Sequence, residues 1–292
     1  MYEITRSPDR EELHAAVAAE SQYLSFHGIR VHFRIDGPVE DPRERVMLLS
    51  SPPINSFHWR KLIPELTQMG CLTAAIDLPG FGRSDCATDV PQDNVTRANI
   101  LWGILDEIDR QAGKPDSVWH LIGHGSACPA VMEMASLYPD SVKSQVHISP
   151  LLSIRQNPKS PPPGQWFRDT VPEPDNFRRM IEHYAGYPLD DYILDRMRAP
   201  LLRPGARERF LRMLRTGREA PECGLGFCPS MVLIGGRDAA MTPPARNEIA
   251  QLMQGAETHV LRSAGHFPME THSKALRDYL RGWIRYNSNE PE

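Results

Sequence analysis

The residues Leu121-Ile122-Gly123-His124-Gly125-Ser126-Ala127 constrain this chain more than any other stretch. An apolar, β-type run at residues 118–122 leads into them, and a helix-compatible stretch at residues 130–138 follows. The small residues between the two let the backbone bend sharply. The sequence therefore predicts a strand, a tight turn and a helix, with Gly125 at the apex of the turn.

Short apolar strands and helix-compatible segments alternate along the first half of the chain, as far as residue 148. In this part, a hairpin is predicted at residues 23–27 and 29–35, strands at 46–49 and 74–77, and helices at 10–20 and 57–66. Two further strands are predicted later in the chain, at 231–234 and 258–261. This alternation is typical of a mostly parallel sheet with helices on both faces.

A proline-rich stretch, with Pro158, Pro161, Pro162 and Pro163, interrupts the alternation. Helix-like segments follow at residues 176–184, 190–198 and 206–215. About 290 residues fit one core with an insertion better than two independent domains. We predict a first part of the core at 1–149, a helical lid at 150–227 and a second part of the core at 228–292.

Four motifs stand in a fixed order along the chain. They are Asp77-Leu78-Pro79-Gly80-Phe81-Gly82-Arg83-Ser84, the turn at 123–127, Gly235-Gly236-Arg237-Asp238 and Gly265-His266-Phe267-Pro268. An elbow followed by an acid and then a histidine is the chain order of the α/β-hydrolases. From about Tyr23 to Tyr286 the chain resembles that superfamily. The resemblance implies the α/β class and an α/β-hydrolase fold: a mostly parallel eight-stranded sheet, helices on both faces and an inserted helical lid.

The resemblance also implies which residues carry chemistry. His266 matches the histidine of the family and Asp238 matches the acid that orients it. The residue at the nucleophile position is Gly125, which has no side chain. The expected triad is therefore degenerate, with two members present and the position of the attacking hydroxyl vacant.

Three explanations of the missing nucleophile stay open on the sequence alone. Ser126 is adjacent, but in this family its side chain faces the helix while its N–H points at the oxyanion. Cys128 lies further towards the helix and has the character of a small core residue. The third is that Gly125 replaces a serine that is native to the position.

A second departure from the family pattern concerns the oxyanion hole. Ser50-Ser51 stands where the family has His-Gly, and Pro52 falls where the family has a backbone N–H donor. Proline has no N–H, and loss of one oxyanion donor typically costs about a hundred- to a thousandfold in rate. If the loop is shifted by one residue, Ile54 or Ser51 donates instead. Two departures together disfavour an efficient acyl-serine hydrolase.

The leading hypothesis is an enzyme without an acyl intermediate. His266, oriented by Asp238, acts as general base on water or on an acidic C–H or O–H of an apolar, carbonyl-containing small molecule. Ser50, Ser51 and His124 are candidates to polarise the carbonyl, and Trp166, Tyr184 and Tyr187 are candidate lid contacts. The alternatives are an ordinary serine hydrolase seen as a Ser-to-Gly variant, and a non-catalytic binder of small molecules.

Charge, apolar runs and cysteine content indicate which classes of partner and which cellular setting to expect. The net charge of −4, with both signs mixed along the chain, does not favour nucleic acid. No apolar run approaches the roughly 20 residues of a membrane helix, and the N-terminus lacks a signal-peptide pattern. The five cysteines are odd in number and show no metal spacing, so free thiols in a reducing, cytoplasmic setting are expected. We expect no metal or other cofactor, and the oligomeric state stays open.

Overall fold

The computed structural model describes residues 21–26, 28–85, 93–115, 117–152, 163–216, 225–226 and 228–288. The helix predicted at residues 10–20 lies outside this part, as do Cys86 and Cys223. Cys71, Cys128 and Cys228 are free thiols.

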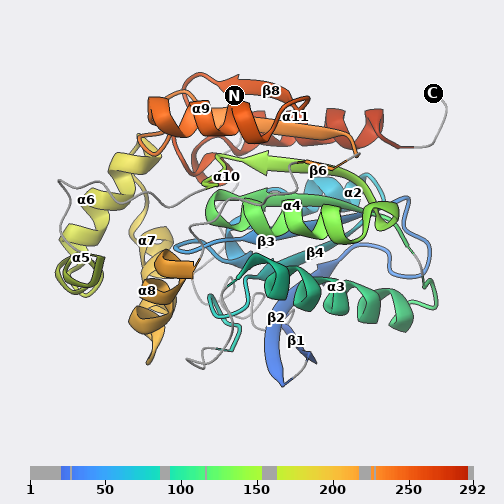
Figure 1. Cartoon of the computed structure of the whole chain (residues 1–292), viewed down its shortest axis with the longest axis horizontal. Helices are drawn as coiled ribbons and strands as arrows, with labels where there is room; N and C mark the ends of the chain where they lie inside the picture. The colour runs from blue at the N-terminus through green and yellow to red at the C-terminus, as the bar shows by residue number, and fades with distance from the viewer. Residues whose placement is uncertain are drawn as a thin grey trace, which may run out of the picture.

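The centre of the structure is an eight-stranded sheet in the order β1-β2-β4-β3-β5-β6-β7-β8. The strands are β1 (Gln22–Phe26), β2 (Ile29–Asp36), β3 (Glu44–Ser50), β4 (Cys71–Asp77), β5 (Trp119–His124), β6 (Val142–Ile148), β7 (Ser230–Gly235) and β8 (Glu257–Leu261). Strands β3 to β8 run parallel, while β2 pairs antiparallel with both β1 and β4. The predicted mostly parallel eight-stranded sheet is confirmed (Figure 1).

Helices cover both faces of the sheet. They are α2 (Ile63–Gln68), α3 (Asn94–Gln111), α4 (Cys128–Leu137), α9 (Pro243–Leu252), α10 (Pro268–Thr271) and α11 (Ser273–Tyr286). Alternate residues of β3 enter different clusters: Val46 and Leu48 pack with α2 and α11, whereas Met47 and Leu49 pack with α3 and α4. Because side chains of a strand point alternately to opposite faces, the fully apolar run of β3 is what a sheet buried on both sides requires.

The helix predicted at residues 57–66 is divided in the structure. A 3-10 helix, η1 (Ser56–Trp59), comes first, and α2 begins only at Ile63. Asn55 caps η1 by accepting a hydrogen bond from the backbone N–H of Phe57. Pro64 is the second residue of α2, where its missing N–H has no intrahelical partner to lose, whereas inside one long helix it would remove a bond.

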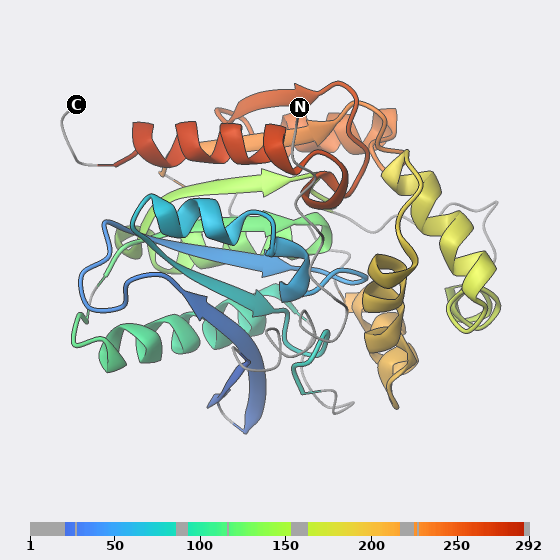
Figure 2. The ribbon, with the colours of Figure 1, turned by 180° about the vertical axis from the view of Figure 1, so that it is seen from behind.

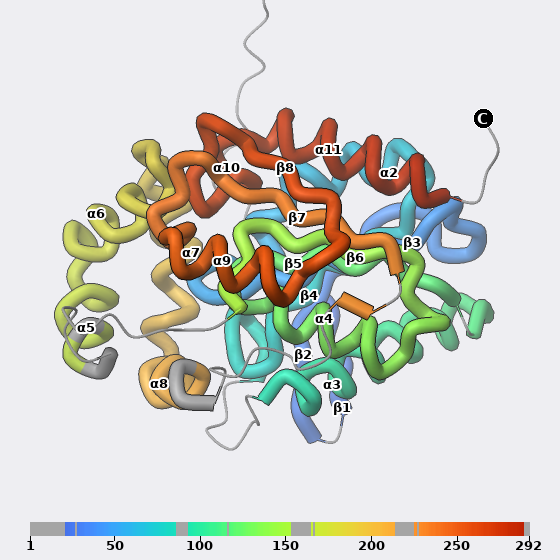
Figure 3. The backbone as a smooth tube through the Cα atoms, turned by 45° about the horizontal axis from the view of Figure 1, so that its top comes forward, coloured from blue at the N-terminus to red at the C-terminus, as the bar shows by residue number. Residues whose placement is uncertain are grey.

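The helices between β6 and β7 form a separate group at one end of the sheet. They are α5 (Pro163–Thr170), α6 (Pro174–Ala185), α7 (Asp191–Arg198), η4 (Ala199–Leu202) and α8 (Ala206–Thr216). The arrowheads of the parallel strands point towards this group (Figure 2), and the tube view shows it beside the sheet rather than over a face (Figure 3). Phe177, Ile181 and Met197 of these helices belong to the same apolar cluster as β3. The group therefore shares the main core.

Candidate active site

The turn after β5 has the geometry of a sharp elbow. β5 ends at His124, a 3-10 helix η2 (Gly125–Ala127) follows, and α4 continues from Cys128. Gly125 has φ +57°, a left-handed conformation that residues with a Cβ rarely adopt. Its carbonyl accepts a hydrogen bond of 3.1 Å from the N–H of Leu151, just beyond β6. Glycine is thus suited to the apex of this turn.

A Cβ atom placed on Gly125 would lie 2.8 Å from Ser51 Oγ and 3.4 Å from His266 Nε2. The two side chains come from turns far apart in the sequence. Ser51 follows β3, which pairs with β5 through Leu49 and Gly123. Ser51 and Gly125 each stand two residues beyond that pair, so parallel pairing brings them side by side.

Asp238 and His266 form a buried pair. Asp238 Oδ2 lies 2.8 Å from His266 Nδ1, and the Asp238 Oδ1 atom accepts a hydrogen bond from the N–H of Ala240. The side chain of Asp238 is fully buried and that of His266 is 8% exposed. Because an ionised carboxylate only accepts hydrogen bonds, Nδ1 carries the proton. The Nε2 lone pair then faces the space above Gly125.

The electrostatics of Asp238 favour its ionised form. Burial raises the pKa of this carboxyl, but the charge and the hydrogen bond of His266, with the Ala240 N–H, outweigh burial and lower the pKa below its usual value. A carboxylate in this state orients the imidazole and stabilises the imidazolium that forms when Nε2 accepts a proton.

The turn that carries His266 is fixed by helix α6. The N–H of His266 donates to the carbonyl of Tyr184 at 2.8 Å. A Cβ on Gly265 would lie only 2.1 Å from the carbonyl oxygen of Ala185, so glycine is required for this close approach. The end of α6 therefore sets the position of His266 directly.

The aromatic residues around this turn have different surroundings. The ring of Tyr184 lies 6.4 Å from the His266 ring, centroid to centroid. Tyr187 packs against His272 and receives a hydrogen bond from Arg237; it lines a cavity of about 270 Å³ with Lys61 and Asp190. The Trp166 side chain lies outside the described residues.

His124 is buried beneath the elbow. Its Nε2 lies 2.8 Å from the carbonyl oxygen of His266; because a carbonyl only accepts, Nε2 is the donor. Burial, followed by the charge of His266, lowers the pKa of His124 to about 3, so the ring is neutral. Its hydrogen-bonding nitrogen supports the backbone of the His266 turn.

The two serines at the end of β3 and just after it, Ser50 and Ser51, differ in their hydrogen bonds. Ser50 Oγ accepts a hydrogen bond of 2.7 Å from the indole N–H of Trp59. No hydrogen bond of Ser51 Oγ is present in the described part of the chain, and this hydroxyl is next to Gly125. Pro52 follows and offers no N–H.

Two other candidate nucleophiles are directed elsewhere. The hydroxyl of Ser126 points to Met213 Sδ of α8, at 4.0 Å. Cys128 is fully buried in an apolar cluster with Met132 and Val232, and burial raises the pKa of its thiol. A thiol of this kind is inert as a nucleophile.

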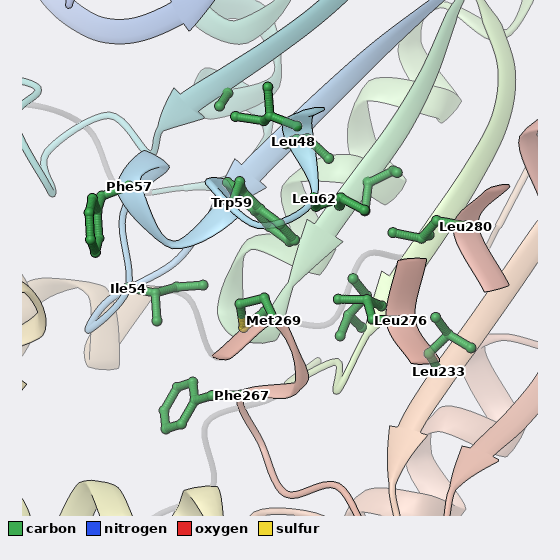
Figure 4. Packing of buried hydrophobic residues seen from close by; sticks show 14 of the residues in the cluster. Leu48, Ile54, Phe57, Trp59, Leu62, Leu233, Phe267, Met269, Leu276 and Leu280 are labelled. Atoms are coloured by element: carbon green, nitrogen blue, oxygen red, sulfur yellow. The ribbon is translucent and has the colours of Figure 1, made fainter. Parts of the chain in front are cut away.

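The ion pair between Arg60 and Glu270 was not identified from the sequence. The carboxylate of Glu270, in α10, receives two hydrogen bonds from the guanidinium of Arg60, at 2.6 and 2.8 Å. Burial raises the pKa of Glu270, but Arg60 and the nearby His58 outweigh it and lower the pKa. An acid four residues after His266 in the sequence was the only signal. Phe267 and Met269, which precede Glu270 in the sequence, pack with Ile54 and Trp59 (Figure 4). The same apolar cluster therefore supports the loop after β3 and the turn that carries His266.

No cluster of three or more His, Cys, Asp or Glu side chains suited to a metal ion occurs among the described residues. In the same part of the chain, no helix combines the length and apolar character needed to cross a membrane.

The model of the alpha/beta hydrolase family matches residues 46–279. The chain belongs to the alpha/beta hydrolase family. Strands β4 to β8, the elbow and the Asp238–His266 pair lie within the matched region, together with helices α5 to α8. The expected fold and membership are confirmed.

The proteins similar to this chain include a haloalkane dehalogenase and epoxide hydrolases. A haloalkane dehalogenase of Psychrobacter cryohalolentis is 40% identical over 83 residues, which are 28% of this chain and 26% of the relative. Epoxide hydrolase B of Mycobacterium tuberculosis is 29% identical over 130 residues, 43% of this chain and 34% of the relative. The matched segments thus span about a third or less of these relatives. The structure of the epoxide hydrolase CorEH superposes with a TM-score of 0.74 at 17% identity, covering 91% of this chain and 98% of that one.

Proposed function

We propose that this alpha/beta hydrolase family member is an enzyme that uses His266 as a general base and forms no acyl intermediate at the elbow. Its substrate is an apolar, carbonyl-containing small molecule. The observation that carries the proposal is the combination of Gly125 with an intact Asp238–His266 pair, since Nε2 faces a volume from which the attacking side chain is missing.

The chemistry balances without a protein nucleophile. A water molecule gives a proton to His266 Nε2 while its oxygen forms a bond to the carbonyl carbon, whose π electrons move to oxygen. When the tetrahedral intermediate collapses, the bond to the leaving group breaks and the imidazolium returns the proton to that group. Asp238 stays ionised throughout and stabilises the imidazolium.

Two features favour this reaction over the hydrolase-variant alternative. Ser51 Oγ lies 2.8 Å from the point at which a side chain at position 125 would begin. Pro52 lacks the N–H that an acyl-serine hydrolase would use. A serine restored at position 125 alone would meet both obstacles.

The test compares the wild type with His266→Gln and Asp238→Asn on p-nitrophenyl acetate, butyrate and octanoate and on benzoylacetone. General-base catalysis predicts a loss of kcat of at least about 100-fold in His266→Gln, no initial burst of nitrophenol and no gain in protein mass. His183→Gln, an exposed histidine of α6, is the matched control.

Equal turnover of His266→Gln and wild type would refute the proposal. A panel compound that raises the melting temperature of the wild type without being consumed would instead favour a binding protein. A burst with a covalent adduct would favour an acyl-enzyme mechanism.

A further inference from the structure

We infer that the Ser51 hydroxyl donates a hydrogen bond to the carbonyl oxygen of the substrate, in place of the backbone N–H that Pro52 lacks. The inference rests on the proposed function, because it assigns the group that binds the carbonyl on which His266 acts. It makes Ser51 a substrate-binding residue and not a nucleophile.

The position of Ser51 is the first observation. Its Oγ and His266 Nε2 lie 2.8 and 3.4 Å from one point, the Cβ position on Gly125. A hydroxyl and a base therefore border the same small volume. A carbonyl group in that volume contacts both, with its oxygen towards Ser51 and its carbon within reach of a water held by His266.

The second observation is that the hydroxyl is available. Ser51 is 2% exposed, yet its Oγ has no hydrogen-bond partner in the described part of the chain. This oxygen is not among the fully enclosed side-chain atoms that lack a partner, so part of its surface remains accessible to a ligand. A ligand oxygen satisfies the Ser51 hydroxyl without displacing any contact within the protein.

The other side-chain groups that could donate to a carbonyl are occupied. Ser50 Oγ accepts the indole N–H of Trp59, and His124 Nε2 donates to the His266 carbonyl. His124 Nδ1 has no partner in the described part of the chain, but it carries no proton, because Nε2 is the donor of this neutral ring. The N–H of Ser126, the second residue of η2, precedes the first intrahelical hydrogen bond, which runs from Cys128 to Gly125. Ser51 thus adds a side-chain donor to a turn that keeps one backbone donor.

A role as donor agrees better with the contacts than a role as nucleophile. A serine nucleophile needs a base within hydrogen-bonding reach, and no hydrogen bond joins Ser51 Oγ to His266 Nε2. The hydroxyl keeps its proton and is free to donate it.

The experiment uses the full chain with Ser51→Ala, and Ser117→Ala in the loop before β5 as control. One readout is kcat/KM for p-nitrophenyl butyrate. The others are the dissociation constant of 4-nitroacetophenone, a ketone without a leaving group, and the infrared carbonyl stretch of its carbonyl-¹³C form. Loss of the donor predicts a drop in kcat/KM of about 100-fold, at least about fivefold weaker ketone binding, and a carbonyl stretch at higher wavenumber.

Unchanged kcat/KM, ketone affinity and carbonyl frequency in Ser51→Ala would overturn the inference. An acyl adduct mapped to Ser51 would overturn it as well, because it would make Ser51 the nucleophile. No measurable binding of the ketone to the wild type also counts against it.

Failure of the proposed function gives a different result. His266→Gln should abolish turnover, and adding Ser51→Ala to that variant should still weaken ketone binding and raise the carbonyl wavenumber. If the wild type turns over no ester, the general-base proposal fails, while the effect of Ser51→Ala on the bound ketone still decides the role of Ser51.

Discussion

Ser51 Oγ lies 2.8 Å from the point that a Cβ atom on Gly125 would occupy. Real Cβ atoms essentially never approach another heavy atom so closely. A side chain at position 125 would therefore require the Ser51 hydroxyl to move.

Gly125→Ser should lower the free energy of unfolding by about 1–2 kcal/mol, because serine must adopt φ +57° and displace the Ser51 hydroxyl. Adding Ser51→Gly should recover about 1 kcal/mol by removing the collision. Urea unfolding of both single variants and the double variant measures this coupling. Strict additivity of the two changes would show that the two side chains do not collide.

Acid should destabilise the protein through three buried neutral histidines. Burial lowers the pKa of His58 to about 4 and the pKa values of His124 and His147 to about 3, from 6.5. Between pH 6.5 and 4 the unfolded chain binds protons that the folded chain does not, so stability falls as pH falls. The slope reaches about 4 kcal/mol per pH unit for the three together.

Replacement of one of these histidines isolates its share of the acid effect. His147→Gln should reduce the slope between pH 6.5 and 4 by up to about 1.4 kcal/mol per pH unit. Urea unfolding at pH 7, 6 and 5 measures it, with the exposed His183→Gln as control. Equal slopes in His147→Gln and wild type would show that His147 is not neutral in the folded state.

Glu270→Gln should cost about 3 kcal/mol of unfolding free energy, because it leaves the half-buried guanidinium of Arg60 without its carboxylate. The double variant Arg60→Met with Glu270→Leu should recover most of this loss, since it removes both charges together. Chemical denaturation at pH 7 checks both values. A double variant less stable than Glu270→Gln would mean that the pair itself is strongly stabilising.

Arg209 should anchor the helices between β6 and β7 to the core. This arginine of α8 is buried, and its Nε donates to the carbonyl of Gly80 at 2.7 Å. Arg209→Met should lower stability by about 2 kcal/mol and speed limited proteolysis within residues 163–216. Arg198→Met is the control, because its contact with the Pro172 carbonyl stays within the helical group. Identical cleavage rates would refute the anchor.

Local sequence was sufficient for the strands and the elbow. The predicted strand at 118–122 and helix at 130–138 appear as β5 (Trp119–His124) and α4 (Cys128–Leu137), because apolar runs and a glycine-rich turn act over neighbouring residues. The division of the helix predicted at 57–66 was missed, although Pro64 was visible in the sequence.

The candidate site was only partly accessible from sequence. Asp238 and His266 were identified by motif, and the structure brings them within 2.8 Å. His124 and Ser50 were candidates for the carbonyl, and the structure places their hydrogen bonds on the His266 carbonyl and on Trp59. Whether a ring nitrogen or a hydroxyl already has a hydrogen-bond partner depends on residues outside the local sequence pattern. The motifs therefore do not predict it.

The amino-acid sequence by itself determined the family, the order of its motifs and the absence of a side chain at Gly125, because each depends on residue identity and short-range spacing. Only the tertiary structure decided that Ser51 lies beside Gly125. That contact follows from the parallel pairing of β3 with β5 in the register Leu49 to Gly123. The register is set by packing both faces of the sheet against helices, a property of the whole fold.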